Sequence, residues 1–314
     1  MRVAAWNCRG IGKDSTVRRL KEIHHKYLLD IICLSETKQQ DNYIRDLSCD
    51  LEFPNYVSVP PIGLSGGLSI FWKQEVDVTV LYQSAHLIDC KVIFNGISFY
   101  LSFVYGYPER QHRHLLWERL ERIAVNRQGR WFITGDFNEI LNHNEKVGGN
   151  ARSDISFNEF RQMIRVCNFT DLKPVGNRFS WTGKRGIHNV SCCLDRAMGN
   201  MDWHQQFPSA ETHFLELGES DHRPLISFFD GHSEDRRHKF MYDDRLRQQE
   251  GFKQSVTTQW KQYDRNGNIS LAHKLQKSRS HISRWKRMHC FNAKERISTL
   301  RHQLDISCTD GHPV

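Results

Sequence analysis

Short apolar segments recur throughout residues 1–230, and their length constrains the fold more than any other feature of the chain. They are rich in β-branched or aromatic residues and are separated by Gly, Pro, Asn or polar residues, a pattern typical of β-strands. The predicted strands are Arg2–Trp6, Asp30–Ser35, Tyr56–Val59, Gly66–Trp72, Val76–Tyr82, His86–Ile93, Ser98–Tyr105, Trp131–Thr134, Phe179–Thr182, Leu194–Met198, Thr212–Leu217 and Leu225–Phe229. So many short strands favour two mostly antiparallel or mixed sheets packed as a sandwich.

Helical spacing of apolar residues interrupts the strand pattern at three places. The first predicted helix follows an N-cap at Asp14-Ser15. The second spans Glu109 to Ala124, with Leu115, Leu116, Leu120 and Ile123 on one face. The third spans Asp154 to Cys167, with Phe157, Phe160, Ile164 and Cys167 on one face. Helices of this kind are expected on the outside of the sheets. The sequence therefore predicts an α+β fold, a two-sheet β-sandwich flanked by helices, over residues 1–229.

The composition changes after residue 230. Residues 230–245 are polar and are predicted to be a linker, and residues 246–314 are predicted to form a helical extension. Residues 231–314 contain 17 Lys and Arg against 9 Asp and Glu, whereas the preceding residues contain 27 of each kind. The net charge of +8 therefore lies at this end of the chain, which indicates a polyanionic partner, with nucleic acid first. A solvated basic helical face is the alternative interpretation.

Two apolar patterns define the predicted helices of the extension. Phe252, Val256 and Trp260 repeat at four-residue spacing, and a polar break begins at Asp264. A second stripe, close to the period of a helix, contains Leu271, Leu275, Ile282, Trp285, Ile297, Leu300 and Leu304. Such a stripe needs a partner, which is either the globular part or another chain.

The composition argues against a membrane protein and against a disulfide framework. The mean hydropathy is -0.62, and no apolar run approaches the length needed to cross a bilayer. The first residues lead directly into a predicted strand and leave no room for a signal peptide. The 9 cysteines are an odd number scattered from Cys8 to Cys308, so we expect reduced thiols in the cytosol or nucleus.

Polar residues follow several of the predicted strands. Asp136 and Asn138 come directly after the apolar run Trp131–Thr134, and we expect them to point the same way toward solvent. A carboxylate and an amide suit a site that orients a water molecule and holds a phosphate or a metal, although alone they also form ordinary turns. Similar residues lie at the ends of other predicted strands, at Asn7, Glu36, Tyr105, Asp195 and Asp221-His222. The complete set indicates a metal-dependent phosphodiesterase.

Six motifs occur in a fixed order: Trp6–Gly10, Leu34–Lys38, Val104–Gly106, Gly135–Asn138, Leu194–Arg196 and Ser220–Pro224. In order and spacing they resemble the endonuclease/exonuclease/phosphatase superfamily, which includes deoxyribonuclease I and the apurinic-site endonucleases. The resemblance covers residues 1 to about 229 and is specific, because an ordered set of motifs rarely arises by chance. It implies the deoxyribonuclease I-like form of the two-sheet sandwich.

The resemblance implies a divalent metal site. Glu36 would be the main ligand of a catalytic Mg²⁺ or Mn²⁺, Asn7 would lie beside it, and Asp221 would complete the site. Carboxylate and amide oxygens suit a hard cation that keeps several of its waters. No other small-molecule cofactor is expected.

The resemblance also implies the catalytic residues. Asp136 would orient or deprotonate the attacking water, and His222 would bind the phosphate and stabilise the pentavalent transition state. Asp195 would hydrogen-bond to His222 and fix its tautomer and charge. The residues expected to hold the scissile phosphate and the rest of the substrate are Asn138, Tyr105, Ser180 and Arg9.

Three further segments, Ser65–Trp72, Phe103–Gly106 and Glu145–Gly149, resemble the endonucleases of plant LINE-type non-LTR retrotransposons. The basic extension is similar to the segment that leads toward the reverse transcriptase in those polyproteins. The resemblance implies nicking of double-stranded DNA, which exposes a 3′-hydroxyl to prime reverse transcription, and hence action in the nucleus. Because no reverse-transcriptase motif precedes Val314, we expect a fragment or a truncated element.

Two alternatives stay open at this point. The same catalytic core serves repair endonucleases, RNA nucleases and phosphoinositide phosphatases, because it recognises a phosphate ester rather than its substituents. Substrate choice is expected to lie in surface loops at Val147–Ser153 and Thr182–Cys192. The other alternative is an inactive element-derived chain that binds nucleic acid, DNA or RNA, through its basic extension.

Overall fold

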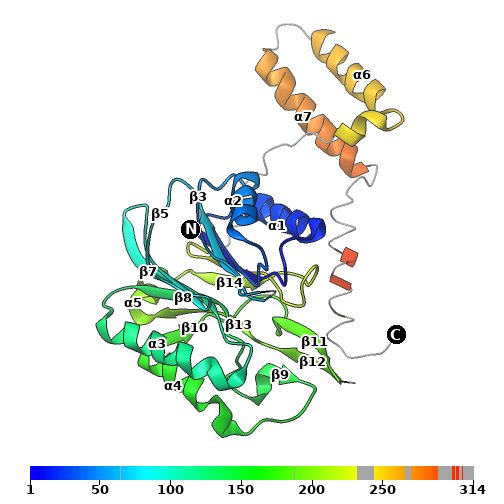
Figure 1. Ribbon diagram of the computed structural model, residues 1–314. Coiled ribbons are helices and arrows are strands. Elements are labelled where there is room, and N and C mark those ends of the chain that lie inside the picture. Colours follow the sequence, from blue (N-terminus) through cyan, green and yellow to red (C-terminus); the bar gives the residue numbers. More distant parts are fainter. Residues whose placement is uncertain are drawn as a thin grey trace. The chain divides into compact units, whose positions relative to one another are not determined.

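The computed structural model describes residues 1–63, 65–186, 188–231, 244–265 and 270–288, together with residues 299, 300, 302, 303 and 306. The chain divides into two compact units, of which the first contains all the described strands and the second contains two long helices (Figure 1). None of the described helices is long and apolar enough to cross a membrane.

The first sheet of the first unit is built around the strand at the N-terminus. Its strands are β1 (Arg2–Asn7), β2 (Ile31–Ser35), β3 (Asn55–Val59), β4 (Leu68–Trp72), β14 (Glu211–Phe214) and β15 (Leu225–Phe228), in the order β14-β15-β1-β2-β4-β3. β1 and β2 are parallel, and the other neighbours are antiparallel. Because β1 lies between β2 and β15, the sheet joins the first and last strands of the unit.

The second sheet has the same number of strands and also contains one parallel pair. Its strands are β5 (Asp77–Gln83), β6 (Leu87–Phe94), β7 (Ile97–Tyr105), β8 (Trp131–Asp136), β10 (Phe169–Asp171) and β13 (Asp195–Asn200), in the order β10-β13-β8-β7-β6-β5. Only β7 and β8 are parallel in this sheet of described strands. Two mixed six-stranded sheets confirm the predicted α+β sandwich.

Side-chain alternation explains why the strands read as continuous apolar runs. In β1, Val3 and Ala5 belong to the core between the two sheets, whereas Ala4 and Trp6 belong to a second core on the outer face. Successive side chains of a strand point to opposite faces, so both faces of this strand are buried. An apolar residue is therefore required at nearly every position.

Helices cover the outer faces of both sheets (Figure 1). Helices α1 (Asp14–Tyr27) and α2 (Asp41–Asp50) share a core with the first sheet, and α3 (Arg113–Asn126) and α4 (Asn158–Val166) share one with the second. The short elements are α5 (Met201–Gln206), η1 (Arg110–His112), η2 (His143–Glu145) and η3 (Asp154–Phe157). The layers therefore follow the order helix, sheet, sheet, helix.

A small third sheet consists of β9 (Lys146–Val147), β11 (Trp181–Arg185) and β12 (His188–Cys192), in the order β11-β12-β9. The predicted surface loop at Thr182–Cys192 is therefore wrong, because these residues form most of an antiparallel hairpin. Trp181, Val190 and Cys192 bury a small core of their own with Ile140 and Phe157. Polar residues at most positions of β12 hid this strand from the sequence pattern.

Helix α2 was not predicted. It buries two apolar side chains, Ile44 and Leu47, which is too short a stripe for periodicity to detect. The predicted N-cap of α1 is also wrong, because the helix begins at Asp14 and the preceding Lys13 makes no side-chain capping bond.

Two predicted apolar faces differ from the observed ones. Leu115 is 46% exposed, whereas Leu116 and Leu120 of the same predicted face are buried. Phe157 lies in η3 rather than in α4 and packs in the core of the hairpin, whereas Phe160 packs against the second sheet. The change from 3-10 to α-helix between them rotates one ring away from the other.

The second unit is a pair of helices, α6 (Phe252–Arg265) and α7 (Leu271–Met288), preceded by η4 (Asp244–Gln248). The rings of Phe252 and Trp285 pack edge to face with their centroids 5.0 Å apart. Both residues pack with Leu246, Val256 and Ile282. Part of the predicted stripe therefore packs on α6. Of its other members, Leu271, Leu275 and Leu300 are exposed, and Ile297 and Leu304 lie outside the described residues.

Candidate active site

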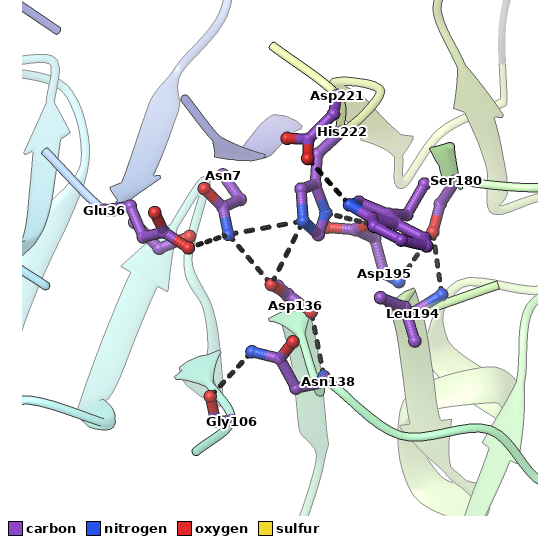
Figure 2. A network of polar contacts seen from close by, with 12 residues as sticks. Asn7, Glu36, Gly106, Asp136, Asn138, Ser180, Leu194, Asp195, Asp221 and His222 are labelled. Carbon is purple, nitrogen blue, oxygen red and sulfur yellow. Dashed lines mark hydrogen bonds and ion pairs between the residues drawn. The ribbon is translucent and has the colours of Figure 1, made fainter. Parts of the chain in front are cut away.

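The strand registers bring predicted site residues to one edge of the sandwich. In the second sheet, Tyr105 of β7 lies opposite Asp136 of β8, which in turn lies opposite Asp195 of β13. In the first sheet, Asn7 is the last residue of β1, and Glu36 comes directly after β2, its parallel neighbour. The side chains from the two sheets meet around one centre (Figure 2).

Two glycines allow the strands to approach closely at this edge. A Cβ at Gly106 would lie 2.1 Å from the carbonyl oxygen of Phe137, and a Cβ at Gly135 would lie 2.1 Å from that of Val104. Atoms cannot approach so closely, so these positions require glycine. The Gly-Asp pair is therefore a packing requirement that places Asp136 at the centre.

Asp136, Asp195 and His222 form the buried half of the site. Nδ1 of His222 lies 2.9 Å from Oδ2 of Asp195, and Nε2 lies 3.7 Å from Oδ2 of Asp136. All three side chains are between 0% and 5% exposed. Burial disfavours the imidazolium, but the two carboxylates outweigh it and raise the pKa of His222 to about 9. The two carboxylates therefore favour the protonated form of His222.

Asp136 does not point toward solvent, contrary to the sequence prediction. β8 continues through Asp136, which is 1% exposed. Oδ1 accepts a hydrogen bond from the backbone N–H of Asn138 at 2.8 Å. Burial raises the pKa of Asp136 to about 7 against the lowering effect of His222. A carboxylate with a pKa near neutrality suits a general base.

Asn7 connects the buried half with the rest of the site. Its Nδ2 donates to Oδ2 of Asp136 at 2.9 Å and to Oε1 of Glu36 at 3.0 Å (Figure 2). Its Oδ1 accepts from the backbone N–H of Arg9 at 3.2 Å. In this arrangement the amide is a hydrogen-bond bridge between two carboxylates.

Glu36, Asp221 and Arg9 form the open half of the site. Their side chains are 16%, 21% and 50% exposed. Nε of Arg9 lies 3.8 Å from Oε2 of Glu36, and Nη1 of Arg9 donates to Oδ2 of Asp221. Nζ of Lys38 lies 3.2 Å from the same oxygen of Glu36, and Nε1 of Trp181 donates to Oδ2 of Asp221 at 2.9 Å.

The surroundings of Glu36 keep it ionised. Burial favours the neutral acid, but hydrogen bonds from Asn7 and Lys38 and the charge of Arg9 outweigh it and hold the pKa of Glu36 below its ordinary value. The hydroxyl of Tyr105 donates to Oε1 of Glu36 at 3.1 Å. Burial and the Glu36 charge raise the pKa of Tyr105, so the phenol remains a donor.

The open half fits a divalent cation. Its donors are carboxylate oxygens that are partly exposed and already attract a guanidinium and an ammonium group. Among the described residues, one group of acidic and histidine side chains has its ligand atoms within 4.8 Å of one another: Asp136, Asp195 and His222. A cation there would compete with the imidazolium that already lies between the two carboxylates.

The position of Ser180 does not suit direct contact with a substrate. It is fully buried, and its Oγ accepts from the backbone N–H groups of Leu194 and Asp195 at 2.8 and 2.9 Å (Figure 2). Its hydroxyl therefore positions the start of β13. Asn138 lies beside the centre, where its Nδ2 donates to the carbonyl oxygen of Gly106 at 2.8 Å.

Left-handed backbone conformations gather at the site. Eight non-glycine residues among those described have a positive φ, and four of them are Arg9, Glu36, Lys38 and Asn138. Each such residue costs about 1–2 kcal/mol and persists only where its surroundings enforce it. Of the four, only Asn138 is a residue type that tolerates this conformation well, so the conformation of the other three could not be predicted from their residue types.

Two residues missed by the sequence analysis fix the loop before β15. Oγ of Ser220 donates to the carbonyl oxygen of Asn7 at 2.8 Å and accepts from the backbone N–H of His222 at 3.1 Å. Nε1 of Trp6 donates to the carbonyl oxygen of His222 at 3.1 Å. Both residues lie inside the recognised motifs, which was the available signal.

The chain belongs to the Endonuclease/Exonuclease/phosphatase family, which matches residues 4–222. The family and the sandwich fold identify it as a hydrolytic phosphoesterase. No curated protein sequence matches the chain.

Solved structures of similar fold include three nucleases. An AP endonuclease from Archaeoglobus fulgidus is 16% identical with a TM-score of 0.57 over 73% of this chain and 99% of that chain. The endonuclease domain of TRAS1, a telomere-specific non-LTR retrotransposon, is 13% identical with a TM-score of 0.53 over 72% and 96%. A 3′-5′ exonuclease from Neisseria meningitidis is 17% identical with a TM-score of 0.53 over 73% and 100%.

Proposed function

We propose that the first unit is a divalent-metal-dependent endonuclease that nicks double-stranded DNA and leaves a 3′-hydroxyl. The observation that carries the proposal is the buried side chain of His222, held between two carboxylates and next to a partly exposed acidic site. The similar folds of an AP endonuclease and of the TRAS1 endonuclease support a nuclease. The motif resemblance to plant LINE-type elements supports a retrotransposon origin and action on nuclear DNA.

The metal belongs to the open half in this proposal. Glu36 is the main ligand, and Asp221 and Asn7 complete the set. A bound Mg²⁺ or Mn²⁺ would supply Lewis-acid stabilisation of the negative charge that develops on the phosphate. Oε2 of Glu36 is the oxygen that faces Arg9 and Lys38, and it is therefore the atom most open to a cation.

The buried half supplies the proton transfer and the fixed positive charge. Asp136 accepts a proton from the water that attacks phosphorus, which its raised pKa favours. The P–O3′ bond breaks and the departing O3′ takes a proton from solvent, so one product carries a 5′-phosphate and the other a 3′-hydroxyl. The imidazolium of His222 stabilises the charge on the phosphate oxygens, and Asp195 holds it in place.

Neutral donors and a basic side chain complete substrate binding. Tyr105 and Asn138 lie on the second-sheet side of the centre. Both are proposed to contact the scissile phosphate. Arg9, which follows β1 and is 50% exposed, is proposed to reach a neighbouring phosphate. Ser180 acts indirectly, because its hydroxyl holds the backbone of Asp195.

The second unit is proposed to add affinity for DNA. Helix α7 contains six Lys and Arg residues and no acidic residue. A helix of this charge binds phosphates without regard to sequence, and such binding weakens steeply as the salt concentration rises.

Supercoiled plasmid nicking tests the function directly. The wild-type chain should convert plasmid to open circles with Mg²⁺ and not with EDTA, and DNA polymerase should extend the nick because it carries a 3′-hydroxyl. His222→Ala should lose this activity, whereas His25→Ala, at an exposed position of α1, should retain it.

The same preparations distinguish the alternatives. Hydrolysis of poly(A) or of an inositol phosphate without plasmid nicking would replace DNA by another phosphate ester on the same site. No hydrolysis of any of these by a folded wild type would reduce the function to nucleic-acid binding.

A further inference from the structure

Arg9 contacts both proposed carboxylate ligands of the metal. Its Nε lies 3.8 Å from Glu36, and its Nη1 donates to Asp221. Nζ of Lys38 also lies 3.2 Å from Oε2 of Glu36. Among the described ion pairs, Lys38 makes none with Asp221. Arg9 is therefore the cation that spans the two acids.

We propose that Arg9 is a built-in counter-ion, which holds Glu36 and Asp221 together in the metal-free protein and has to leave them when the metal binds. The inference rests on the metal site assigned under the proposed function. One guanidinium and one divalent cation cannot both occupy the space between the same carboxylate oxygens. Metal binding and the Arg9 bridge are therefore alternative states.

The local backbone suits a side chain that moves while its main chain stays fixed. The backbone N–H of Arg9 donates to Oδ1 of Asn7, and its left-handed φ of 48° is followed by Gly10 with a φ of 110°. Half of the Arg9 side chain is exposed, so the guanidinium has space on the solvent side. Once displaced, it can contact a phosphate of the substrate.

The charge balance gives the exchange a direction. Without metal, Glu36 and Asp221 would repel each other across a partly exposed site, and Arg9 removes much of that repulsion. A divalent cation neutralises both acids alone and makes the guanidinium surplus there. The bridge therefore lowers metal affinity, and it makes the released Arg9 available to the substrate only when metal is present.

Binding of Mn²⁺ to metal-free protein, followed by the loss of the free-ion signal in electron paramagnetic resonance, tests the exchange without any catalytic turnover. Arg9→Gln should bind Mn²⁺ about five- to tenfold more tightly than wild type, since a partly exposed bridge is lost. Arg9→Lys keeps the charge but lacks the fork that reaches two acids, and it should also bind more tightly. Arg45→Gln removes an equal charge on α2, where Arg45 pairs only locally with Asp46, and should match wild type.

Each result supports or overturns one statement. Unchanged Mn²⁺ affinity in Arg9→Gln would overturn the bridge. If Arg9→Gln binds Mn²⁺ more tightly but Arg9→Lys binds it as wild type does, the effect is one of general charge, and the bridge is also overturned. Glu36→Gln should weaken Mn²⁺ binding about tenfold or more. Absence of any saturable Mn²⁺ binding that depends on Glu36 would overturn the proposed metal site and the exchange together. Circular dichroism of each variant checks that the fold is kept.

Discussion

The two halves of the site solve the same electrostatic problem in different ways. In the buried half, Asp136 and Asp195 are neutralised by the imidazolium of His222, and all three are almost fully enclosed. In the open half, Glu36 and Asp221 are neutralised by the side chain of Arg9, which is half exposed. One half is completed by the fold, and the other is completed by a replaceable cation.

The two halves therefore differ in whether their neutralising charge is a fixed side chain or an exchangeable cation. Enclosed charges gain from a low local dielectric and lose heavily when one partner is removed, because the remaining charge is left buried. Partly exposed charges are screened by water and tolerate exchange. Damage to the buried half should therefore be permanent, whereas damage to the open half should be compensated by added metal.

His222→Ala should have the largest effect. It removes the positive charge beside the phosphate and leaves two buried carboxylates without their counter-ion, so we expect the nicking rate to fall about 10³-fold or more. Raising the Mg²⁺ concentration should not restore the rate. Plasmid nicking across a Mg²⁺ series measures this, and recovery at high Mg²⁺ would remove the distinction between the halves.

Asp195→Asn should have the next largest effect, and it tests whether Asp195 sets the charge of His222. We expect the imidazole of His222 to titrate near pH 9 in metal-free wild type and at a lower pH in the variant. Because the folded pKa exceeds the ordinary value of about 6.5, protonated His222 stabilises the fold fully below pH 6.5, and this contribution is lost as the pH rises through 9. NMR of the His222 ring measures the shift. An equal pKa in both proteins would show that Asp195 does not set the charge.

Glu36→Gln should mainly change the metal requirement. Loss of the principal carboxylate should raise the Mg²⁺ concentration for half-maximal nicking about tenfold or more, with a smaller loss of rate at saturating metal. A Mg²⁺ titration of the variant measures both quantities, and Asp46→Asn on the exposed side of α2 is the matched control. If saturating metal does not recover most of the rate, a substitution in the open half cannot be compensated by metal, as in the buried half.

Ser180→Ala should have the smallest effect on catalysis and a clear effect on stability. Two backbone N–H groups, those of Leu194 and Asp195, would lose their buried acceptor, at a cost of about 1–3 kcal/mol in the free energy of unfolding. Urea denaturation measures this cost. A rate that falls more than a hundredfold with unchanged stability would instead indicate direct contact between Ser180 and the substrate.

Strand positions were predictable because both faces of the central strands are buried. Continuous short apolar runs such as Trp131–Thr134 are best interpreted as buried strands. The mixture of parallel and antiparallel strand pairs agrees with the predicted sandwich. Helix α2 and strand β12 escaped prediction for the opposite reason. Their few apolar side chains are buried by neighbours far along the chain, which local periodicity does not record.

The sequence predicted candidate site residues as types and positions, and the strand registers bring several of them together, but their surroundings could not be predicted. The burial of Asp136 depends on strand pairing with Tyr105 and Asp195, which comes from distant segments. The contact of Arg9 with Asp221 spans 212 positions and cannot be seen in a local motif. Roles that follow from residue chemistry were therefore accessible, whereas roles that follow from contact, such as that of Ser180, required the fold.

The pairing of β1 with β15 has a consequence for synthesis on the ribosome. Asn7 and His222, which lie 3.5 Å apart, are separated by 215 positions, so translation at ordinary rates makes one roughly 10–40 s before the other. Until β15 emerges, β1 lacks one of its two neighbours and the imidazolium is absent. A nascent chain that ends before His222 therefore lacks part of the candidate site, which is completed only late in synthesis.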